Sequence, residues 1–242
     1  MDRGILIHDG LQPCPYLEGE SARMPLYRQP RALSLEEADD RFALAERRVG
    51  WALYRTECPS CQACQGLRVL VNDFKMSSSQ RRVWNRWRKL GDRLRMTMGP
   101  VSWSPEKLEI YNRHKLGRNL VASEDGALEP AGYVGWLVRS CFQTVEMCYY
   151  IDEKLIGVGI LDLGAEAASS VYFYFEPSKE ISRLSPGVFS VLQEIAFCKR
   201  SGRKFHYLGL YVRDCRSVNY KANYNPHQRL KGGVWRTVTG DE

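Results

Sequence analysis

The sequence of 242 residues lacks several features that would place it in a special class of protein. It has no uninterrupted apolar run of about eighteen residues, the minimum length for a membrane-spanning helix. Its first residues have neither the basic start nor the apolar segment of a secretory signal. It has no internal repeat and no low-complexity tract. Because 44% of the residues are hydrophobic, we expect a folded, soluble, cytoplasmic protein that does not act in a membrane.

A disulfide framework is also not expected, although the chain has eight cysteines. Such frameworks belong to secreted chains, so these cysteines indicate reduced thiols or a metal site. Cys58, Cys61 and Cys64 follow one another at two-residue gaps, and Cys14 is the only other cysteine in this half of the chain. Four such thiolates could hold zinc or an iron–sulfur cluster, and structural or redox-active thiols are the alternative. The remaining four are expected to be packing residues: Cys141, Cys148, Cys198 and Cys215.

Positive charge is concentrated in two tracts of the chain, whose formal net charge is +7. Residues 41–95 hold 13 Lys and Arg against 4 acidic residues, and residues 199–236 hold 10 against 1. Two such tracts favour a binding face for a polyanion such as a nucleic acid, whereas two solvated basic surfaces are the alternative. Aromatic residues lie among the basic ones, as stacking on unpaired bases would require: Trp84, Trp87, Tyr207, Tyr211, Tyr220 and Tyr224.

The most basic segment of the first tract is predicted to be a helix over residues 77–90. Its charged residues either face solvent or bind a phosphate or a carboxylate: Arg81, Arg82, Arg86, Arg88 and Lys89. Residues 91–100 are expected to be a linker. The chain would then divide into an N-terminal domain, residues 1–95, with the cysteine cluster and the basic helix, and a second domain, residues 100–242.

The second half of the chain has the order strand, strand, strand, helix, strand. The strands are predicted at residues 145–151, 155–163, 171–175 and 205–212. The helix is predicted to begin after Ser185, which can cap it, with Pro186 in its first position and Gly202 at its end. Gly209 interrupts the last strand, where the missing side chain lets a ligand or another backbone approach.

This order resembles the core of the N-acetyltransferase superfamily, in which a mixed sheet opens to hold an acyl donor. The resemblance implies that the helix start at Ser185, Pro186 and Gly187 lies near phosphates of the donor, because its free N–H groups suit an anion. An ordinary α+β core with a normally capped helix is the alternative. The predicted fold class is α+β: an N-terminal cysteine-containing α/β domain plus a C-terminal N-acetyltransferase-like mixed sheet with flanking helices.

A second resemblance is more specific and covers nearly the whole chain. The motifs that carry it are Cys14-x-Tyr16-Leu17, Ala22-Arg23-Met24, Tyr54-Arg55-x-x-Cys58-Pro59-x-Cys61-x-x-Cys64, Leu67-Arg68-Val69, Ser79-Gln80-Arg81-Arg82, Tyr172-x-Tyr174-x-x-Pro177, Tyr207-Leu208-Gly209 and Tyr220-Lys221-x-x-Tyr224-x-Pro226. They occur in the order found in the aminoacyl-tRNA protein transferases. The short chain resembles the bacterial aspartate/glutamate leucyltransferases more than the longer eukaryotic arginyltransferases. Pro186, Glu46 and the run Arg216-Ser217-Val218 depart from the family pattern.

The resemblance implies transfer of an aminoacyl group, leucine in the bacterial branch, from aminoacyl-tRNA to proteins that begin with Asp or Glu. This marks those proteins for degradation through the N-degron pathway. An aminoacyl ester is already activated, and an α-amine has a pKa of about 8, so alignment carries most of the catalysis and no cofactor is obligatory. The family also implies that the cysteine group of Cys14, Cys58, Cys61 and Cys64 could hold an iron–sulfur cluster or zinc for structure or redox regulation.

The residues expected to carry this function fall into three groups. The acidic N-terminal side chain is assigned to arginines, which bind carboxylates in a bidentate manner: Arg47, Arg48, Arg81 and Arg82. The end of the tRNA is expected to meet Ser185, Gly187, Tyr207, Gly209, Tyr211, Tyr220 and Lys221. The base that accepts the proton of the α-amine is predicted to be Glu176 or Asp214, or a backbone carbonyl acting through water.

Three other functions stay open at this point. Arginine could be the transferred amino acid in place of leucine. The chain could be an N-acetyltransferase that uses coenzyme A, although its glycine-rich phosphate loop would be limited to Pro186-Gly187. It could also be a non-catalytic module that binds RNA or acidic degrons, because the two basic tracts by themselves would satisfy such a role.

Overall fold

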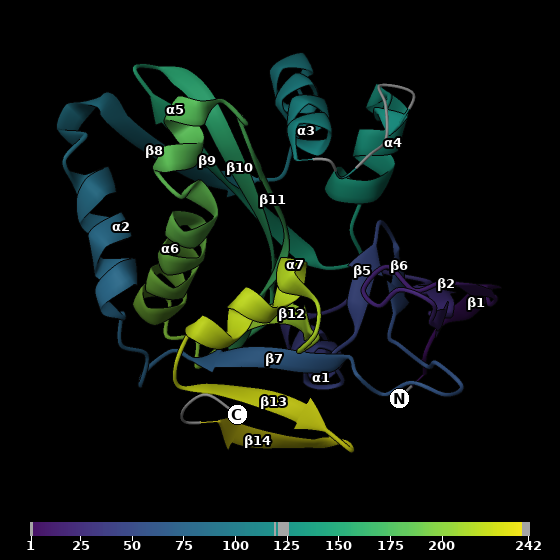
Figure 1. The fold of residues 1–242 in the computed structure, drawn as a ribbon. Helices are drawn as coiled ribbons and strands as arrows, with labels where there is room; N and C mark the ends of the chain where they lie inside the picture. Colours follow the sequence, from purple (N-terminus) through teal and green to yellow (C-terminus); the bar gives the residue numbers. More distant parts are fainter. Residues whose placement is uncertain (1, 119, 121–125, 239–242) are drawn as a thin grey trace.

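A mixed sheet of eight strands forms the centre of the molecule (Figure 1). The structure is a computed structural model that describes residues 2–118, 120 and 126–238. In sheet order the strands are β14 (Val234–Val238), β13 (His227–Lys231), β7 (Gln65–Leu70), β12 (Phe205–Tyr211), β11 (Ala167–Phe175), β10 (Lys154–Leu163), β9 (Gln143–Ile151) and β8 (Leu94–Pro100). Neighbouring strands are antiparallel except β11 and β12, which are parallel. With helices on both faces, this arrangement confirms the α+β fold class.

The sheet opens between β11 and β12. These strands pair only from Ala167 to Ser169, opposite residues 205–207. On the other side of β11, the register with β10 shifts so that Val171 is an extra residue between two paired positions. On β12 the register with β7 shifts in the same way at Leu208. Because a bulge bends its strand, β11 and β12 diverge beyond Ser169, and we call the space between them the split.

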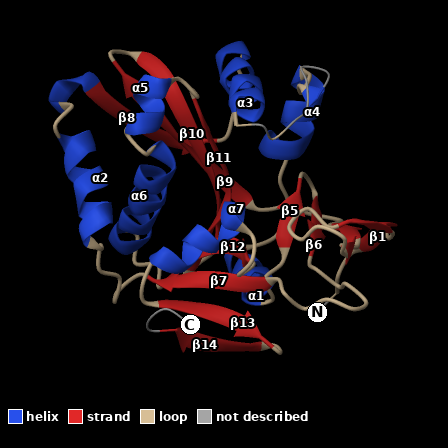
Figure 2. Ribbon diagram, viewed as in Figure 1, coloured by secondary structure: helices blue, strands red, loops and turns tan. Residues whose placement is uncertain are grey.

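One face of the sheet is covered by α2 (Ser78–Arg88), α5 (Lys179–Arg183) and α6 (Pro186–Arg200), and Figure 2 shows α2 and α6 side by side. Phe189 of α6 stacks on Trp87 of α2, with ring centroids 4.3 Å apart. After β12 the chain returns to this face in α7 (Arg216–Asn219) and the 3₁₀ turn η4 (Tyr220–Asn223), after which Tyr224 packs against α6 in one apolar cluster.

The opposite face carries α1 (Leu35–Ala43), α3 (Pro105–Gly117) and α4 (Pro130–Tyr133), which continues as the π-helical turn η3 (Val134–Val138). Alternate residues of β10 divide between the two faces: Val158 and Ile160 pack with α3, whereas Leu161 packs with α2 and α6. Ser34 and Glu37 form a capping box at the start of α1. Within the described residues, no helix is both long enough and apolar enough to cross a membrane.

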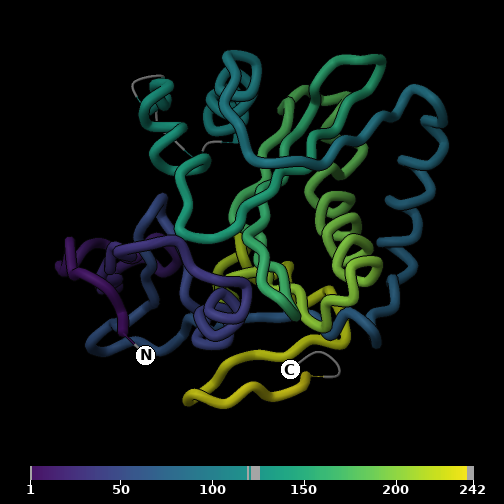
Figure 3. Tube along the Cα trace, turned by 180° about the vertical axis from the view of Figure 1, so that it is seen from behind, coloured from purple at the N-terminus to yellow at the C-terminus, as the bar shows by residue number. Residues whose placement is uncertain are grey.

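The N-terminal residues form two small sheets beside the split of the large sheet. A four-stranded sheet has the order β1 (Ile5–His8), β4 (Leu26–Arg28), β6 (Ala52–Tyr54) and β5 (Arg47–Val49), and β2 (Leu11–Pro13) pairs with β3 (Ser21–Arg23). Figure 3 shows these strands gathered at one side of the molecule, with the β13–β14 hairpin at the bottom. The short β5 matters most, because it carries Arg47 to the split.

Two predictions about the chain are wrong. Residues 91–100 are not a linker: after the 3₁₀ turn η1 (Gly91–Arg93) they form the edge strand β8, which pairs with β9. Ser185 does not cap α6 with its side chain, because it has a left-handed conformation with φ of 57°. The division into residues 1–95 and 100–242 stays a prediction, but the large sheet does not follow it, since β7 lies between β12 and β13.

Candidate functional site

The split is occupied by the side chain of Arg47. Its Nη1 donates a hydrogen bond to Ser169 Oγ at 3.0 Å. Its Nη2 donates to the carbonyl oxygens of Ser170 at 2.6 Å and Val171 at 3.3 Å. These are the carbonyls of β11 that lose their partner strand where β12 diverges. Arg47 therefore satisfies the opened edge of the sheet and brings a positive charge into the split.

Gly209 of β12 makes room for this arginine. It has a φ of +84°, and a Cβ atom at this position would lie 3.0 Å from Arg47 Cζ. The sequence pattern predicted a close approach of a ligand or a backbone to Gly209. The structure shows that the guanidinium of Arg47 takes this space instead, because glycine alone leaves room for a planar group against the strand.

A second cation, Lys221 of η4, enters from the α6 side. Its Nζ donates a hydrogen bond to the carbonyl oxygen of Leu210 at 2.6 Å, on the diverging part of β12. Burial, together with the nearby charge of Arg47, lowers the pKa of Lys221 to about 7. Two basic side chains from distant parts of the chain thus hold the freed carbonyls of the two separated strands.

The surroundings of these cations are aromatic and sulfur-containing. Burial raises the pKa of Tyr16 to about 12, and Tyr54, Cys64, Arg47 and Cys215 are all near enough to contribute. Tyr220 as a whole residue is 44% exposed. Burial raises the pKa of its hydroxyl, and the charge of Glu194 adds to the effect.

Beneath the split lies a buried polar network centred on Glu194 of α6. Its Oε2 accepts hydrogen bonds from Ser170 Oγ at 2.5 Å and His206 Nε2 at 2.9 Å, and its Oε1 accepts one from Ser190 Oγ at 3.0 Å. Burial by itself lowers the pKa of His206, but its hydrogen bonds with Cys198 and Glu194 outweigh burial and raise that pKa to about 10. The network therefore contains an ion pair between His206 and Glu194, which anchors α6 to β12. The hydrogen bond from Ser170 anchors α6 to β11.

This arrangement suits an anionic or carbonyl-containing ligand. Arg47 and Lys221 hydrogen-bond to neutral carbonyl and hydroxyl oxygens. Within the part of the chain that the structure describes, neither forms an ion pair with a carboxylate. A guanidinium with uncompensated charge can bind a carboxylate, and a lysine with a pKa near 7 can both accept and donate a proton at neutral pH.

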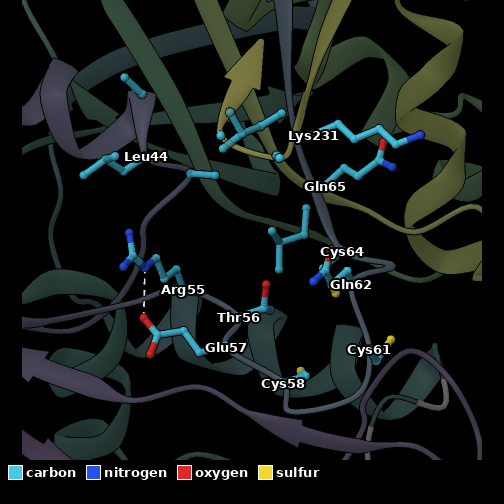
Figure 4. A pocket seen from close by; sticks show the side chains of 17 residues that line it. Leu44, Arg55, Thr56, Glu57, Cys58, Cys61, Gln62, Cys64, Gln65 and Lys231 are labelled. Carbon is cyan, nitrogen blue, oxygen red and sulfur yellow. Dashed lines mark hydrogen bonds and ion pairs between the residues drawn. The ribbon is translucent and has the colours of Figure 1, made fainter. Parts of the chain in front are cut away.

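The cysteine cluster borders a pocket of about 510 Å³ near the split (Figure 4). Cys58, Cys61 and Cys64 line it together with the ion pair of Arg55 and Glu57. Burial raises the pKa of the Cys64 thiol to about 12, and the nearby thiols of Cys58, Cys14, Cys61 and Cys215 raise it further. The sulfur atoms of these five cysteines thus lie near one another.

By donor type this group fits a soft metal ion or an iron–sulfur cluster, since sulfur is the ligand that both prefer. By geometry it does not: among the described residues, no three Cys, His, Asp or Glu side chains converge as a metal ion requires. Figure 4 shows Cys58, Cys61 and Cys64 at separate places along their loop. The metal site stays a prediction, and no step of the chemistry below depends on it.

Of the four predicted carboxylate-binding arginines, the structure brings only Arg47 to the split. Arg48 is buried, and its Nε donates to both oxygens of Asp162 at 3.0 and 2.8 Å. The rest of its guanidinium donates to backbone carbonyls of residues 136, 137 and 139, so it has no free edge for a substrate. Arg81 and Arg82 are exposed on α2, on the outer side of the molecule.

The predicted tRNA-binding residues also separate into two groups. Tyr220, Lys221 and Gly209 lie at the split. Tyr207 and Tyr211 are each 5% exposed and belong to the apolar core, so they do not offer a face for stacking. The start of α6, with Ser185 and Gly187, lies farther along β11, where a Cβ on Gly187 would be 4.0 Å from Phe173.

The two predicted bases occupy different places. Glu176 follows the end of β11 and forms an ion pair with Arg113 at 2.7 Å. At about 3.3 Å per residue it is roughly 17 Å from Val171 and the split. Asp214 is exposed just after β12, next to Cys215, whose charge affects Lys221. Asp214 is thus the nearer of the two to the split.

Sequence reasoning missed three participants of this site: Tyr16, Cys215 and Glu194. Tyr16 lies in the recognised Cys14-x-Tyr16-Leu17 motif, which was a signal for it. Cys215 was expected to be a packing residue, and only the fold brings it to the cysteine cluster. Glu194 lies within an apolar helical pattern, where a single acidic residue was the available signal.

Comparison with known proteins identifies the family of this chain. Residues 12–82 match the family model for the N terminus of arginine-tRNA-protein transferase, and residues 106–231 match the model for its C terminus. A protein of Aeromonas hydrophila named aspartate/glutamate leucyltransferase is 30% identical over 244 residues, which cover 98% of both chains. One of Acinetobacter baumannii with the same name is 33% identical, over 93% of this chain and 81% of its own.

A solved structure supports the fold alone. The C-terminal domain of a protein from Agrobacterium fabrum, named for lysylphosphatidylglycerol synthetase, has a TM-score of 0.50 and 14% identity. The match covers 73% of this chain and 59% of that one. The two family models and the relatives show that this chain belongs to the arginine-tRNA-protein transferase family.

Proposed function

We propose that this protein transfers leucine from leucyl-tRNA to the α-amine of proteins whose first residue is Asp or Glu, and so marks them for degradation in the cytoplasm. Two findings support this choice of substrates. The relatives are named aspartate/glutamate leucyltransferase, and this chain matches both family models. The observation that carries the proposal is the placement of Arg47 and Lys221 together in the split of the sheet.

In this proposal Arg47 binds the acidic side chain of the protein substrate. Its Nη2 already points at carbonyl oxygens of β11, and its planar group lies against Gly209, which keeps its orientation constant. A guanidinium held in this way can present its remaining edge to a carboxylate. Arg48, which is fully engaged by Asp162 and backbone carbonyls, supports β5 and does not contact substrate.

The aminoacyl ester is proposed to lie beside Lys221 and Tyr220. The α-ammonium of the protein substrate first releases one proton to solvent. The resulting amine attacks the ester carbonyl carbon and gives a second proton to a base, and the C–O bond to the ribose breaks. The proton then passes to the departing ribose oxygen. With a pKa of about 7, Lys221 is suited to accept and return this proton, and Asp214 is the alternative base near the split.

An iron–sulfur cluster or zinc on the cysteine group stays part of the proposal as a structural or redox element. When bound, it would supply structural cross-linking of the loop that contains Cys58, Cys61 and Cys64 to Cys14. The transfer itself needs only alignment and proton movement, because the ester is already activated.

The test is transfer of radiolabelled Leu, and in parallel Arg, from charged tRNA to peptides that begin with Asp, Glu, Ala or Lys. Leu appearing only on the Asp and Glu peptides is the expected result. Arg on these peptides in place of Leu would redirect the donor assignment to arginine, which the description of the matching family model favours. Absence of transfer from both donors by the folded protein would refute the proposal.

A further inference from the structure

Helix α2 carries an exposed basic face that the transfer chemistry does not use. Arg82, Arg86 and Lys89 follow one another at four- and three-residue spacing, so they form one row on the helix surface. At 1.5 Å rise per residue, the row extends for about 10 Å. Arg81 and Arg88 lie in the adjacent row, and all five side chains are exposed.

The charge of this face is not neutralised by the protein. Arg81 donates to the carbonyl oxygen of Met76 at 3.1 Å, and Arg86 donates to the carbonyl oxygen of Arg183. Within the described ranges, no carboxylate forms an ion pair with any of the five. A shallow groove lined by Arg82, Asn85, Arg86, Arg88 and Lys89 follows the face. Five uncompensated charges along one helix suit a partner with several negative charges better than a single carboxylate.

The opposite side of α2 is fixed in the core. Trp87 is fully buried, stacks on Phe189, and donates from Nε1 to the carbonyl oxygen of Leu184 at 2.8 Å. Val83 is buried beside it. The apolar side is therefore unable to enter a lipid surface, as an amphipathic membrane helix must. A rigid basic face with no exposed apolar residue is suited to a phosphate backbone.

The face begins beside the turn that carries Lys221. Gln80, in the first turn of α2, donates from Nε2 to the carbonyl oxygen of Asn223 in η4 at 3.1 Å. Figure 1 shows α2, α6 and α7 on the same side of the sheet. An RNA whose 3′ end reaches Lys221 in the split can therefore extend its backbone along α2.

We propose that the α2 face binds the sugar-phosphate backbone of the tRNA whose aminoacylated end lies in the split. The inference rests on the proposed function for the identity of the RNA. In this proposal Arg81 and Arg82 contact the tRNA and do not recognise the acidic N-terminal residue. Contacts of this kind carry no base sequence, so they position the tRNA without selecting its amino acid.

The test is equilibrium binding of uncharged tRNA as a function of salt concentration. The variant R82Q/R86Q/K89Q is compared with R28Q/R118Q/R139Q, which removes three exposed positive charges outside α2 and outside both basic tracts. Since each phosphate contact contributes roughly 0.7 to 0.9 to the salt slope, the α2 variant should lower the slope by about two and weaken binding at least tenfold. The control variant should leave both values within about twofold. Binding of uncharged tRNA needs no transfer, so its outcome is separate from that of the proposed function.

A transfer measurement provides the second arm. The α2 variant should raise KM for full-length aminoacyl-tRNA at least tenfold, and should leave KM for a short aminoacylated CCA fragment and the preference for Asp over Ala peptides unchanged. Equal salt slopes for the two variants would overturn the inference. A loss of Asp preference in the α2 variant would also overturn the inference. The same holds if this variant loses binding to phosphatidylglycerol vesicles while it still binds tRNA.

Discussion

The guanidinium of Arg47 lies against Gly209, where a Cβ atom would be 3.0 Å from Arg47 Cζ. One residue comes from a three-residue strand near the N-terminus and the other from a central strand of the large sheet. Their contact joins the N-terminal strands to the place where the sheet opens, so it ties the geometry of the split to a single backbone position.

Gly209→Ala should therefore impair transfer through Arg47. The added methyl group pushes the guanidinium away from Ser170 and Val171, and we expect at least a tenfold loss of transfer to Asp peptides. Gly202→Ala is the matched control, because Gly202 also has a positive φ, +74°, but has open space around it. Both variants should lose about 1 kcal/mol of unfolding free energy from the strained backbone. Equal activity of the two variants would show that the contact does not matter.

Arg47 and Arg48 should respond in opposite ways to replacement by Ala. Arg48→Ala leaves Asp162 buried without its cation, so the unfolding free energy should fall by about 3 kcal/mol or more. Arg47→Ala should cost about 1–2 kcal/mol, because it frees only neutral oxygens, two backbone carbonyls and the Ser169 hydroxyl, but should reduce transfer to Asp peptides at least a hundredfold. Urea denaturation and peptide transfer assays measure the two effects. A strongly destabilised but active Arg47→Ala, with a stable but inactive Arg48→Ala, would contradict the assignment.

Lys221 should make stability depend on pH. Its pKa is lowered from about 10.5 in the unfolded chain to about 7 in the fold. Between these values the unfolded state binds more protons, so the unfolding free energy should rise from pH 7 toward pH 10 by an amount on the order of a few kcal/mol. Lys221→Met should remove this rise, whereas Lys231→Met, at an exposed position, should retain it.

The same titration should appear in catalysis if Lys221 is the base. With the native protein, the rate of transfer at saturating substrate should increase with pH through about 7, as the amine of Lys221 loses its proton. In Asp214→Asn this rise should persist. A rise that disappears in Asp214→Asn, and persists in Lys221→Met, would give the role of base to Asp214.

Removal of metal should leave transfer within about twofold of its starting rate, because the split aligns an activated ester without a metal ion. Protein purified without oxygen would be analysed for iron and zinc, treated with a chelator, and assayed for transfer and for unfolding. Loss of stability with retained transfer would support a structural metal on Cys14, Cys58, Cys61 and Cys64. A loss of transfer that returns on adding the metal back would overturn the metal-independent mechanism.

Local patterns in the sequence were sufficient for much of the fold. The strands β9 and β10 and the proline at the start of α6 are confirmed, because each depends on residues close together in the chain. The motifs also identified the family, which the comparisons confirm. Residues 91–100 were misjudged because an edge strand such as β8 is stabilised by β9, some fifty residues away, and its own sequence gives little sign of it.

The site depended on tertiary structure. Arg47 and Arg48 are adjacent in sequence, and both were assigned to the carboxylate. Along β5, however, adjacent side chains point to opposite sides, so one enters the split and the other is buried on Asp162. In the same way, Tyr207 and Lys221 belong to motifs of one family, yet one is core and the other lies in the split. Sequence by itself determined which residue types and which family are present. Only the bulges at Val171 and Leu208, through the opening they produce, decided which of those residues meet.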